Sequence, residues 1–249
     1  MISERLRNAL ARARSVAALT GAGISAESGV PTFRSKGGIW TKMRPEELAS
    51  MDGFLRNPEL VWEWYGQRKR IMAEVQPNPG HRALAHMEHL FPHFAIITQN
   101  IDNLHQRSGS TVVHELHGNI ERNYCMECGI RYGNAEVLSM TGVPRCTACG
   151  GSIRPDVVWF GEMLPMEEWN AAVRAAESAD IFLSIGTSAA VQPAASLPGL
   201  AKEAGALLVE INPEPTSITS HADEFLQGPA GTIVPALYAL AEAARKESQ

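Results

Sequence analysis

Short apolar runs that end in small or polar residues recur along the chain. They are SVAALTG at 15–21, FAIITQN at 94–100, IFLSIGT at 181–187 and ALLVEIN at 206–212. Segments of helical or irregular pattern separate these runs, and strands that alternate with helices predict an α/β fold with a parallel sheet covered on both faces. Because ligands bind beyond the carboxyl ends of such strands, the polar residues there are the first candidates for a functional site.

The stretch VWEWYGQRKR at 61–70 predicts a helix that begins with Asn57 as N-cap and Pro58 as its first residue. Its predicted apolar face consists of Val61, Trp64, Tyr65, Ile71 and Met72. Arg68 falls within that face. A buried guanidinium without a partner costs several kcal/mol, so Arg68 needs an anionic partner or contact with water. There are two structural alternatives for Arg68. It could form a salt bridge with Glu46, Glu47 or Glu63, or its aliphatic stem could pack in the core while its guanidinium reaches solvent.

Composition indicates a globular protein of ordinary character. The 249 residues are 45% apolar and 20% charged, and no apolar run approaches the roughly 20 residues that span a bilayer. The length suits one sizeable domain with a small insertion or two compact domains.

The net charge of −5 argues against nucleic acid as a partner. The arginine-rich start resembles a first helix more than a transit peptide, and without an export signal we expect a cytoplasmic protein that binds no membrane.

Four cysteines form two C-x2-C pairs, Cys125 with Cys128 and Cys146 with Cys149. This spacing is typical of a zinc ribbon, in which four thiolates surround the ion as a tetrahedron. Four sulfur ligands leave no open position, so this zinc should stabilise the fold and take no part in chemistry. Free core cysteines and disulfides are the alternatives, and a reducing compartment disfavours disulfides.

A glycine-rich turn follows the first predicted strand. Gly21, Gly23 and Ala26 form a G-x-G-x-x-A pattern, which can bring backbone amides and a helix N-terminus to a pyrophosphate. A tight structural turn is the alternative. Gly29 and Pro31 cut short the helix that a standard dinucleotide fold has next, and no second strand carries an acidic residue about 20 positions on. We therefore predict a modified dinucleotide site in which residues 30–40 cover the ligand.

Polar residues also follow the second predicted strand. Gln99, Asn100 and Asp102 could bind ribose hydroxyls and an amide, and His117 could act as a general base. Capping and turn formation are the alternative for Asn100 and Asp102. The remaining histidines are predicted to be helix-surface or packing residues: His81, His86, His89, His93, His105, His114 and His221.

The order of these motifs resembles the sirtuins, NAD-dependent protein lysine deacylases. The shared motifs are GAGIS-x-x-SG-V-P-x-FR, TQNID-x-LH, HG, the two C-x2-C pairs, FGE, GTS and N-x-E. The resemblance implies a Rossmann-like large domain, at about 1–34, 80–120 and 156–249. It also implies a small lobe, made of a helical module at about 35–79 and a zinc ribbon at about 121–155. NAD and an acyl-lysine protein or peptide would meet between them, in a chain expected to be a monomer.

The resemblance also implies roles for individual residues. Catalysis would rest on His117 and Asn100. Nicotinamide would leave first, and an imidate would then join ADP-ribose to the acyl-lysine. His117 would act on this intermediate as the general base for a ribose hydroxyl. NAD would be bound by Gly21, Ala22, Gly23, Ser25, Phe33, Arg34, Trp40, Gln99, Asn100, Ile101, Asp102, Gly186, Thr187, Ser188, Asn212, Pro213, Glu214 and Ala230. The segment VVWFGE would pair with the peptide backbone through Val158, Phe160, Gly161 and Glu162.

Tyr65 and Arg68 match a Tyr-x-x-Arg pair of the desuccinylase-like (class III) sirtuin subgroup, and Ala49 matches its small pocket residue. The implied reaction is removal of succinyl and malonyl groups, with weaker deacetylation, yielding nicotinamide and O-acyl-ADP-ribose. A succinyl or malonyl carboxylate would give Arg68 a charge-assisted partner, and the Tyr65 hydroxyl could add a hydrogen bond. A plain deacetylase, a non-catalytic NAD-binding zinc-ribbon scaffold and mono-ADP-ribosyl transfer are the alternatives.

Overall fold

The computed structural model describes residues 2–32 and 44–247. Its strands are β1 (Ser15–Thr20), β2 (His93–Thr98), β3 (Val113–Glu115), β4 (Gly118–Cys125), β5 (Arg131–Gly133), β6 (Ile153–Val157), β7 (Ile181–Ile185), β8 (Leu207–Asn212) and β9 (Glu224–Gln227). Its helices are α1 (Glu4–Arg12), α2 (Ala22–Ser25), α3 (Pro45–Leu48), α4 (Met51–Arg56), α5 (Pro58–Glu74), α6 (Pro79–Met87), α7 (Leu104–Arg107), α8 (Asn134–Ser139), α9 (Met166–Glu177), α10 (Leu197–Glu203) and α11 (Ala230–Glu247). Short 3-10 turns lie at Ala26–Ser28 and Ala194–Ser196.

Within the described chain, a six-stranded parallel sheet has the order β3-β2-β1-β7-β8-β9. Counted in chain order these strands run 3-2-1-4-5-6, the order of the Rossmann fold. The four strands predicted from apolar runs are confirmed. Their residues are buried almost throughout, as expected for strands covered on both faces.

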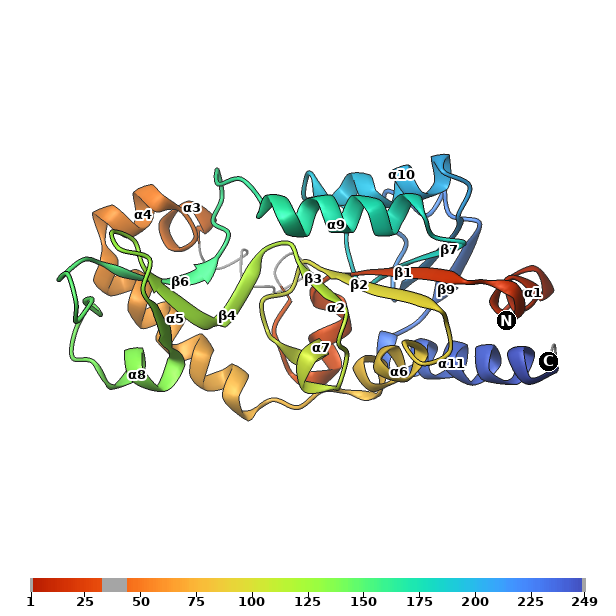
Figure 1. Ribbon diagram of the computed structural model, residues 1–249, viewed down its shortest axis with the longest axis horizontal. Helices are drawn as coiled ribbons and strands as arrows, with labels where there is room; N and C mark the ends of the chain where they lie inside the picture. The colour runs from red at the N-terminus through yellow and green to blue at the C-terminus, as the bar shows by residue number, and fades with distance from the viewer. Residues whose placement is uncertain (1, 33–43, 248–249) are drawn as a thin grey trace.

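Helices cover both faces of the large sheet. In Figure 1, α9 and α10 lie above the sheet, whereas α6 and α11 lie below it. The upper core joins Leu19 and Phe182 to alanines of α9, and the lower core joins Ile96 and Val209 to Leu237 of α11. These two layers hold the sheet rigidly, so residues just beyond its strand ends have fixed positions.

The small lobe consists of α3, α4 and α5 with a three-stranded sheet in the order β5-β4-β6. One apolar core runs through the helices and the ribbon, and it includes Tyr65, Trp159, Cys125 and Cys146. Figure 1 shows α5 running beside β4 and β6. The ribbon and the helical module therefore stabilise each other.

Helix α5 begins as predicted. The Asn57 side chain accepts a hydrogen bond from the Leu60 amide at 3.1 Å, and Pro58 is the first helical residue. The predicted face is wrong for Ile71, which is 44% exposed. Ile71 is one residue from Met72 and therefore about 100° around the helix from it, at the margin of the buried arc. Lys69, on the opposite margin, is buried instead.

No helix in residues 2–32 and 44–247 combines the length and the apolar character that a bilayer span requires.

Candidate active site

The carboxyl ends of β1, β2, β7 and β8 lie along one edge of the large sheet. Thr20 ends β1 and pairs in register with Thr98 on one side and Ile185 on the other. Strand order reverses between β1 and β7, which makes this edge the place where a Rossmann sheet binds its ligand. The polar residues that follow these strands in the sequence are therefore brought together.

The glycine turn packs directly against the turn after β7. The Gly21 amide donates to the Ile185 carbonyl at 3.0 Å, and the Gly23 amide donates to the Gly186 carbonyl at 2.8 Å. A Cβ on Gly23 would lie 2.6 Å from the Gly186 Cα, and Gly186 itself has a φ of +59°. Glycine is thus required here so that two backbone turns can touch. The predicted contact of these glycines with a pyrophosphate stays a prediction.

Asn100, Asp102 and Ser25 form a buried cluster below this turn. The Asn100 amide group donates to the Gly21 carbonyl at 3.1 Å and to the Ser25 hydroxyl at 3.2 Å. The Ser25 hydroxyl donates to the Asp102 carboxylate at 2.7 Å, and burial raises the pKa of Asp102. The side chains predicted at a ribose and nicotinamide pocket therefore hold one another in fixed orientations.

A small cavity of about 20 Å³ lies beside this cluster. Its lining comes from both lobes and consists of Ala22, Val30, Arg68, Met72, Asn100, Ile101, Asp102 and Ile120. The predicted cofactor residues Ala22, Ile101 and Asp102 thus share a wall with Arg68 of α5. Residues predicted for the cofactor and Arg68, predicted for the acyl group, therefore line the same cavity.

His117 lies at the turn between β3 and β4. Its Nδ1 is 3.0 Å from the backbone carbonyl oxygen of Gln99, and burial lowers the pKa of the imidazole. The carbonyl of His117 accepts from the Val158 amide at 2.9 Å. The candidate base is therefore fixed to the end of β2 on one side and to the predicted peptide segment on the other.

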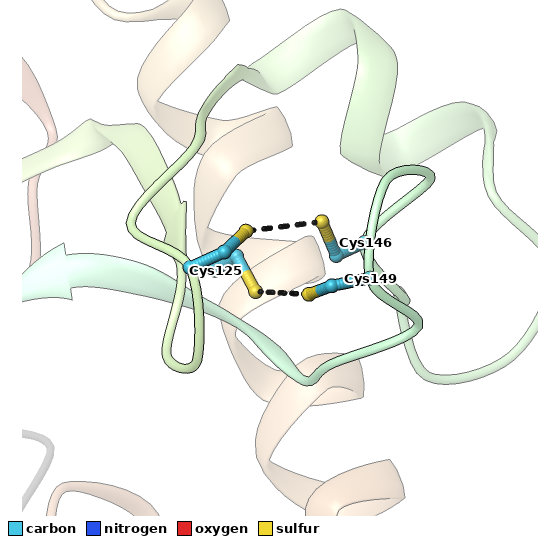
Figure 2. A group of neighbouring side chains, drawn as sticks. Cys125, Cys146 and Cys149 are labelled. Atoms are coloured by element: carbon cyan, nitrogen blue, oxygen red, sulfur yellow. Dashed lines mark hydrogen bonds between the residues drawn. The ribbon is translucent and has the colours of Figure 1, made fainter.

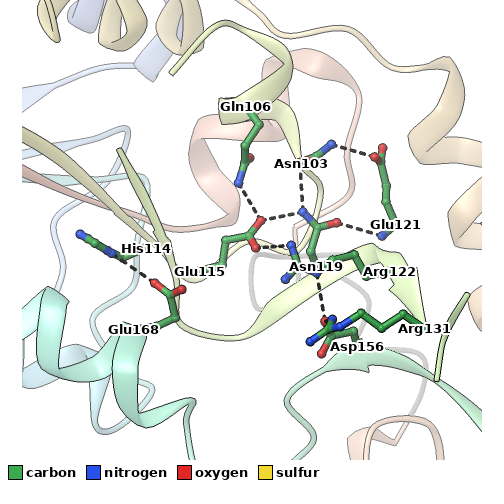
Figure 3. Close-up of polar contacts among 10 residues, drawn as sticks. All are labelled: Asn103, Gln106, His114, Glu115, Asn119, Glu121, Arg122, Arg131, Asp156 and Glu168. Carbon is green, nitrogen blue, oxygen red and sulfur yellow. Dashed lines mark hydrogen bonds and ion pairs between the residues drawn. The ribbon is translucent and has the colours of Figure 1, made fainter. Parts of the chain in front are cut away.

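A polar network supports the turn that carries His117 (Figure 3). The Glu115 carboxylate accepts hydrogen bonds from Gln106 at 2.7 Å, from Asn119 at 2.6 Å and from Arg122 at 2.7 Å. Arg122 also reaches Asp156 of β6 at 3.0 Å. Because Glu115 and Asn119 stand two residues before and after His117, the network supports the backbone on both sides of this residue.

Several of the residues predicted to bind NAD lie at or near the turn after β7. The Thr187 hydroxyl accepts from the Gln99 side chain at 3.0 Å, and the Thr187 carbonyl accepts from the Asn212 side chain at 3.3 Å. Ser188, Pro213 and Glu214 are exposed beside them. Ala230 is buried at the start of α11, and its carbonyl adjoins Gly80 of α6. Phe33, Arg34 and Trp40 lie outside the described residues.

Tyr65 and Arg68 are both buried side chains of α5. Tyr65 is 2% exposed, and burial raises its pKa to about 12. Arg68 is 9% exposed, its guanidinium carbon is 4.6 Å from the centre of the Trp64 ring, and burial lowers its pKa. Glu47 pairs with Arg44 at 3.8 Å, and Glu63 accepts from Gln67 at 3.4 Å.

The predicted peptide segment is attached to both lobes. Besides the contact of Val158 with His117, the Phe160 amide donates to the carbonyl of Ala49 at 2.8 Å. Ala49 is buried, whereas Phe160 is 46% exposed, and Gly161 has a φ of +88°. The Glu162 carboxylate is held by Arg154 at 2.5 Å and 3.0 Å. Sequence reasoning missed Arg154, whose role depends on a turn that brings Glu162 back beneath it.

The four cysteine sulfurs converge, all within 4.8 Å of one another (Figure 2). The distances from Cys125 to Cys149 and from Cys128 to Cys146 are both 3.5 Å. A tetrahedral zinc with four sulfurs at about 2.3 Å requires sulfur separations of about 3.8 Å, so the cluster suits one structural zinc ion.

Two histidines that were predicted to be helix-surface or packing residues form a buried pair behind the site. The rings of His81 and His105 are 5.0 Å apart, centre to centre, and both side chains are fully or nearly fully buried. His105 Nε2 is 2.9 Å from the Thr20 hydroxyl, and His81 Nε2 is 3.4 Å from the Ser25 hydroxyl. Burial lowers the pKa of His81 to about 4 and that of His105 well below its usual value. Both are therefore neutral side chains near neutral pH.

Comparison with known proteins identifies the family. The model of the Sir2 family matches residues 21–193. The chain is 52% identical over 228 residues to NAD-dependent protein deacylase 2 of Pyrobaculum aerophilum, covering 92% of this chain and 91% of that protein. It is 51% identical over 224 residues to the NAD-dependent protein deacylase of Aquifex aeolicus, covering 90% and 93%.

Solved structures agree with the sequence relatives. A complex of a Sir2 homologue with NAD superposes with a TM-score of 0.91 at 43% identity, over 100% of this chain and 96% of that one. A complex of Sir2 with a p53 peptide and NAD+ superposes with a TM-score of 0.88 at 33% identity, over 98% and 100%. The family model, the relatives and the shared fold together show that the chain belongs to the Sir2 family of NAD-dependent protein deacylases, the sirtuins.

Proposed function

We propose that this sirtuin prefers to remove succinyl and malonyl groups from lysine side chains, and that it removes acetyl groups more weakly. NAD is the co-substrate of the family. The observation that carries the proposal is the position of Arg68, which lines one cavity together with Ala22, Asn100 and Asp102. An acyl group that reaches the candidate ribose pocket would have its far end beside this guanidinium.

Electrostatics favour an acidic acyl group at this position. Burial disfavours the charged form of Arg68, yet a guanidinium stays protonated in proteins. Its small exposed fraction is inconsistent with a head group extended into solvent. A carboxylate can bind a guanidinium with two parallel, charge-assisted hydrogen bonds. Acetyl-lysine offers only a methyl group there, so it gains nothing from the arginine.

The other residues would divide the reaction between them. His117 presents Nε2 as a base, because its Nδ1 faces a carbonyl that can only accept a hydrogen bond. Asn100 and Asp102 would orient the ribose and nicotinamide, with Ser25 holding both side chains in place. Residues 158–162 would bind the peptide backbone, and the substrates would be acylated-lysine proteins or peptides.

A panel of acyl peptides tests the preference. We would measure kcat/KM with NAD for one peptide carrying succinyl, malonyl or acetyl on the same lysine. Succinyl and malonyl should exceed acetyl, and Arg68→Met should lower the succinyl value by about a hundredfold, which corresponds to the loss of a charge-assisted pair. Arg70→Met, the same change at an exposed position of α5, is the matched control and should leave the preference intact. Acetyl turnover equal to or above succinyl turnover would exclude the proposal.

A plain deacetylase is the second candidate, and the apolar part of the cavity favours it. Val30, Met72, Ile101 and Ile120 would suit an acetyl methyl group. The same panel separates the two functions, because a plain deacetylase would lose little when Arg68 is replaced. If no acyl peptide released nicotinamide, the chain would instead be an NAD-binding scaffold.

A further inference from the structure

A partly buried ion pair joins Arg154 to the last residue of the predicted peptide segment, Glu162. Arg154 of β6 is 2% exposed, and its two terminal nitrogens each donate to one carboxylate oxygen of Glu162, at 2.5 Å and 3.0 Å. The same guanidinium donates to the Val157 carbonyl at 2.8 Å. Two parallel hydrogen bonds fix both the distance and the plane of the carboxylate. The beginning and the end of the segment are therefore held to one side chain.

Trp159 is fixed by the same ion pair. Its backbone amide donates to the Glu162 carboxylate at 2.8 Å, and its ring centre is 3.5 Å from the guanidinium carbon of Arg154. The Glu162 amide closes the turn by donating to the Trp159 carbonyl at 3.0 Å. The amide, the carbonyl and the ring of Trp159 are thus all held by contacts with Arg154 or Glu162.

The indole is directed at helix α5. Trp159 is 1% exposed, and its Nε1 donates to the Tyr65 hydroxyl oxygen at 2.9 Å. An indole nitrogen can only donate, so the phenol oxygen is the acceptor in this bond and its own hydrogen is free to be donated elsewhere. Arg68 lies one helical turn along α5 from Tyr65.

We propose that Trp159 is a specificity-determining positioning residue: it orients the Tyr65 hydroxyl so that its hydrogen is donated to the carboxylate of a succinyl or malonyl group. Arg154 and Glu162 act through Trp159 by holding its ring and amide. The inference rests on the proposed preference for acidic acyl groups. It assigns the selection of the acyl group partly to the segment that binds the peptide, and not to α5 alone.

The test removes single hydrogen bonds and measures the preference for succinyl over acetyl substrate. In Trp159→Phe the aromatic packing against Arg154 remains and the indole donor is lost. The ratio of kcat/KM for the succinyl peptide to that for the acetyl peptide should fall about tenfold, as expected for one charge-assisted hydrogen bond. Tyr65→Phe should lower the same ratio, and the double variant should be no worse than Tyr65→Phe alone, because Trp159 acts through that hydroxyl.

A matched control is available in the same core. Trp62 lies on α5, as Tyr65 does. It is 6% exposed, and its Nε1 donates to the Ile153 carbonyl at 3.0 Å. Trp62→Phe removes an equivalent indole bond and should lower the melting temperature without changing the ratio. A general loosening of the small lobe would instead lower the ratio in both variants, and that result would overturn the inference.

The outcomes separate the two proposals. A wild-type ratio of one or less removes the proposed preference, and the inference falls with it. A wild-type ratio well above one that Trp159→Phe leaves unchanged overturns the inference alone, as does strict additivity of Trp159→Phe and Tyr65→Phe. A ratio reduced in Trp159→Phe and not reduced further in the double variant supports it.

Discussion

The imidazole Nδ1 of His117 lies 3.0 Å from the backbone carbonyl oxygen of Gln99. Since a carbonyl oxygen only accepts hydrogen bonds, Nδ1 carries the hydrogen and Nε2 keeps its lone pair. The backbone carbonyl of the first residue after β2 thus sets the tautomer that a general base requires. The polar network around Glu115 supports the backbone on both sides of this histidine.

The pH profile of the reaction should reflect this burial. Burial lowers the pKa of His117 below its usual 6.5. A general base acts as the neutral imidazole, so the role proposed for His117 predicts that kcat/KM is retained as pH falls to 6.5 and is lost only in a more acidic range. Initial rates measured with NAD and one acyl peptide across this range check the expectation, with circular dichroism to confirm folding. An acidic limb centred above 6.5 would contradict it, and His117→Ala should abolish turnover at every pH.

The buried histidine pair should make the protein acid-sensitive. Unfolded histidine binds a proton near pH 6.5, whereas folded His81 does so at about 4 and folded His105 well below 6.5. The unfolded chain therefore binds protons on this pair at a higher pH than the folded chain does, and the free energy of unfolding should decrease as pH falls below 6.5, by up to ~1.4 kcal/mol per proton and pH unit.

Urea titrations at a series of pH values measure this dependence. His105→Gln removes one of the two groups, so its free energy of unfolding should fall less steeply between pH 6.5 and 5 than that of the wild type. Other acid-sensitive groups, the cysteines included, are common to both proteins and cancel in the comparison. Parallel curves for the two proteins would show that the pair does not control acid stability.

The contact between the two backbone turns should not tolerate a methyl group. A Cβ on Gly186 would lie 2.4 Å from the Ile24 nitrogen, at a φ of +59° that favours glycine. Gly186→Ala should therefore destabilise the fold by about 3 kcal/mol or more. Gly199→Ala is the control, because its Cβ would meet nothing within 4 Å and it lies exposed in α10. Calorimetry should show a lower melting temperature for the first variant and an equal or higher one for the second.

Zinc removal should affect helix α5 as well as the zinc ribbon. Cys125 and Cys146 are buried in the same core as Tyr65 and Trp159. Without the ion, four clustered thiolates repel one another, and the small lobe should loosen. A strong chelator should abolish deacylation and expose tryptophans to a fluorescence quencher, and added zinc should reverse both effects. An active protein that is proven free of zinc would contradict this expectation.

The backbone layout could be predicted from sequence because burial on both faces leaves uninterrupted apolar runs such as IFLSI and ALLVEI. The cysteine cluster could be predicted because C-x2-C spacing is a local geometric requirement. Strands β3 and β9 were not predicted, since Val113–Glu115 and Glu224–Gln227 are short edge strands with no such run. Edge strands are defined by their neighbours and have little local pattern.

The site was predictable where residues follow strand ends, as with Asn100 and Asp102, and less so where function depends on contacts distant in sequence. Trp159 and Tyr65 are separated by 94 positions, and nothing local relates them. The glycine turn was correctly located. The sequence could not show why glycine is required at position 23, which is the close contact of Gly23 with Gly186. Individual ligand contacts of these residues stay predictions.

Arg68 and Lys69 are neighbours on α5 with separate attachments. Arg68 lines the cavity, while the Lys69 ammonium donates to the Ile120 carbonyl and, at 2.8 Å, to the Asn134 side chain beside the ribbon. The two side chains differ by about 100° in direction around the helix axis. Insertion or deletion of one residue in α5 would turn the helix by that angle and displace both contacts at once. Under the proposed function, the choice of acyl group and the anchoring of the ribbon are a single property, the rotational setting of one helix.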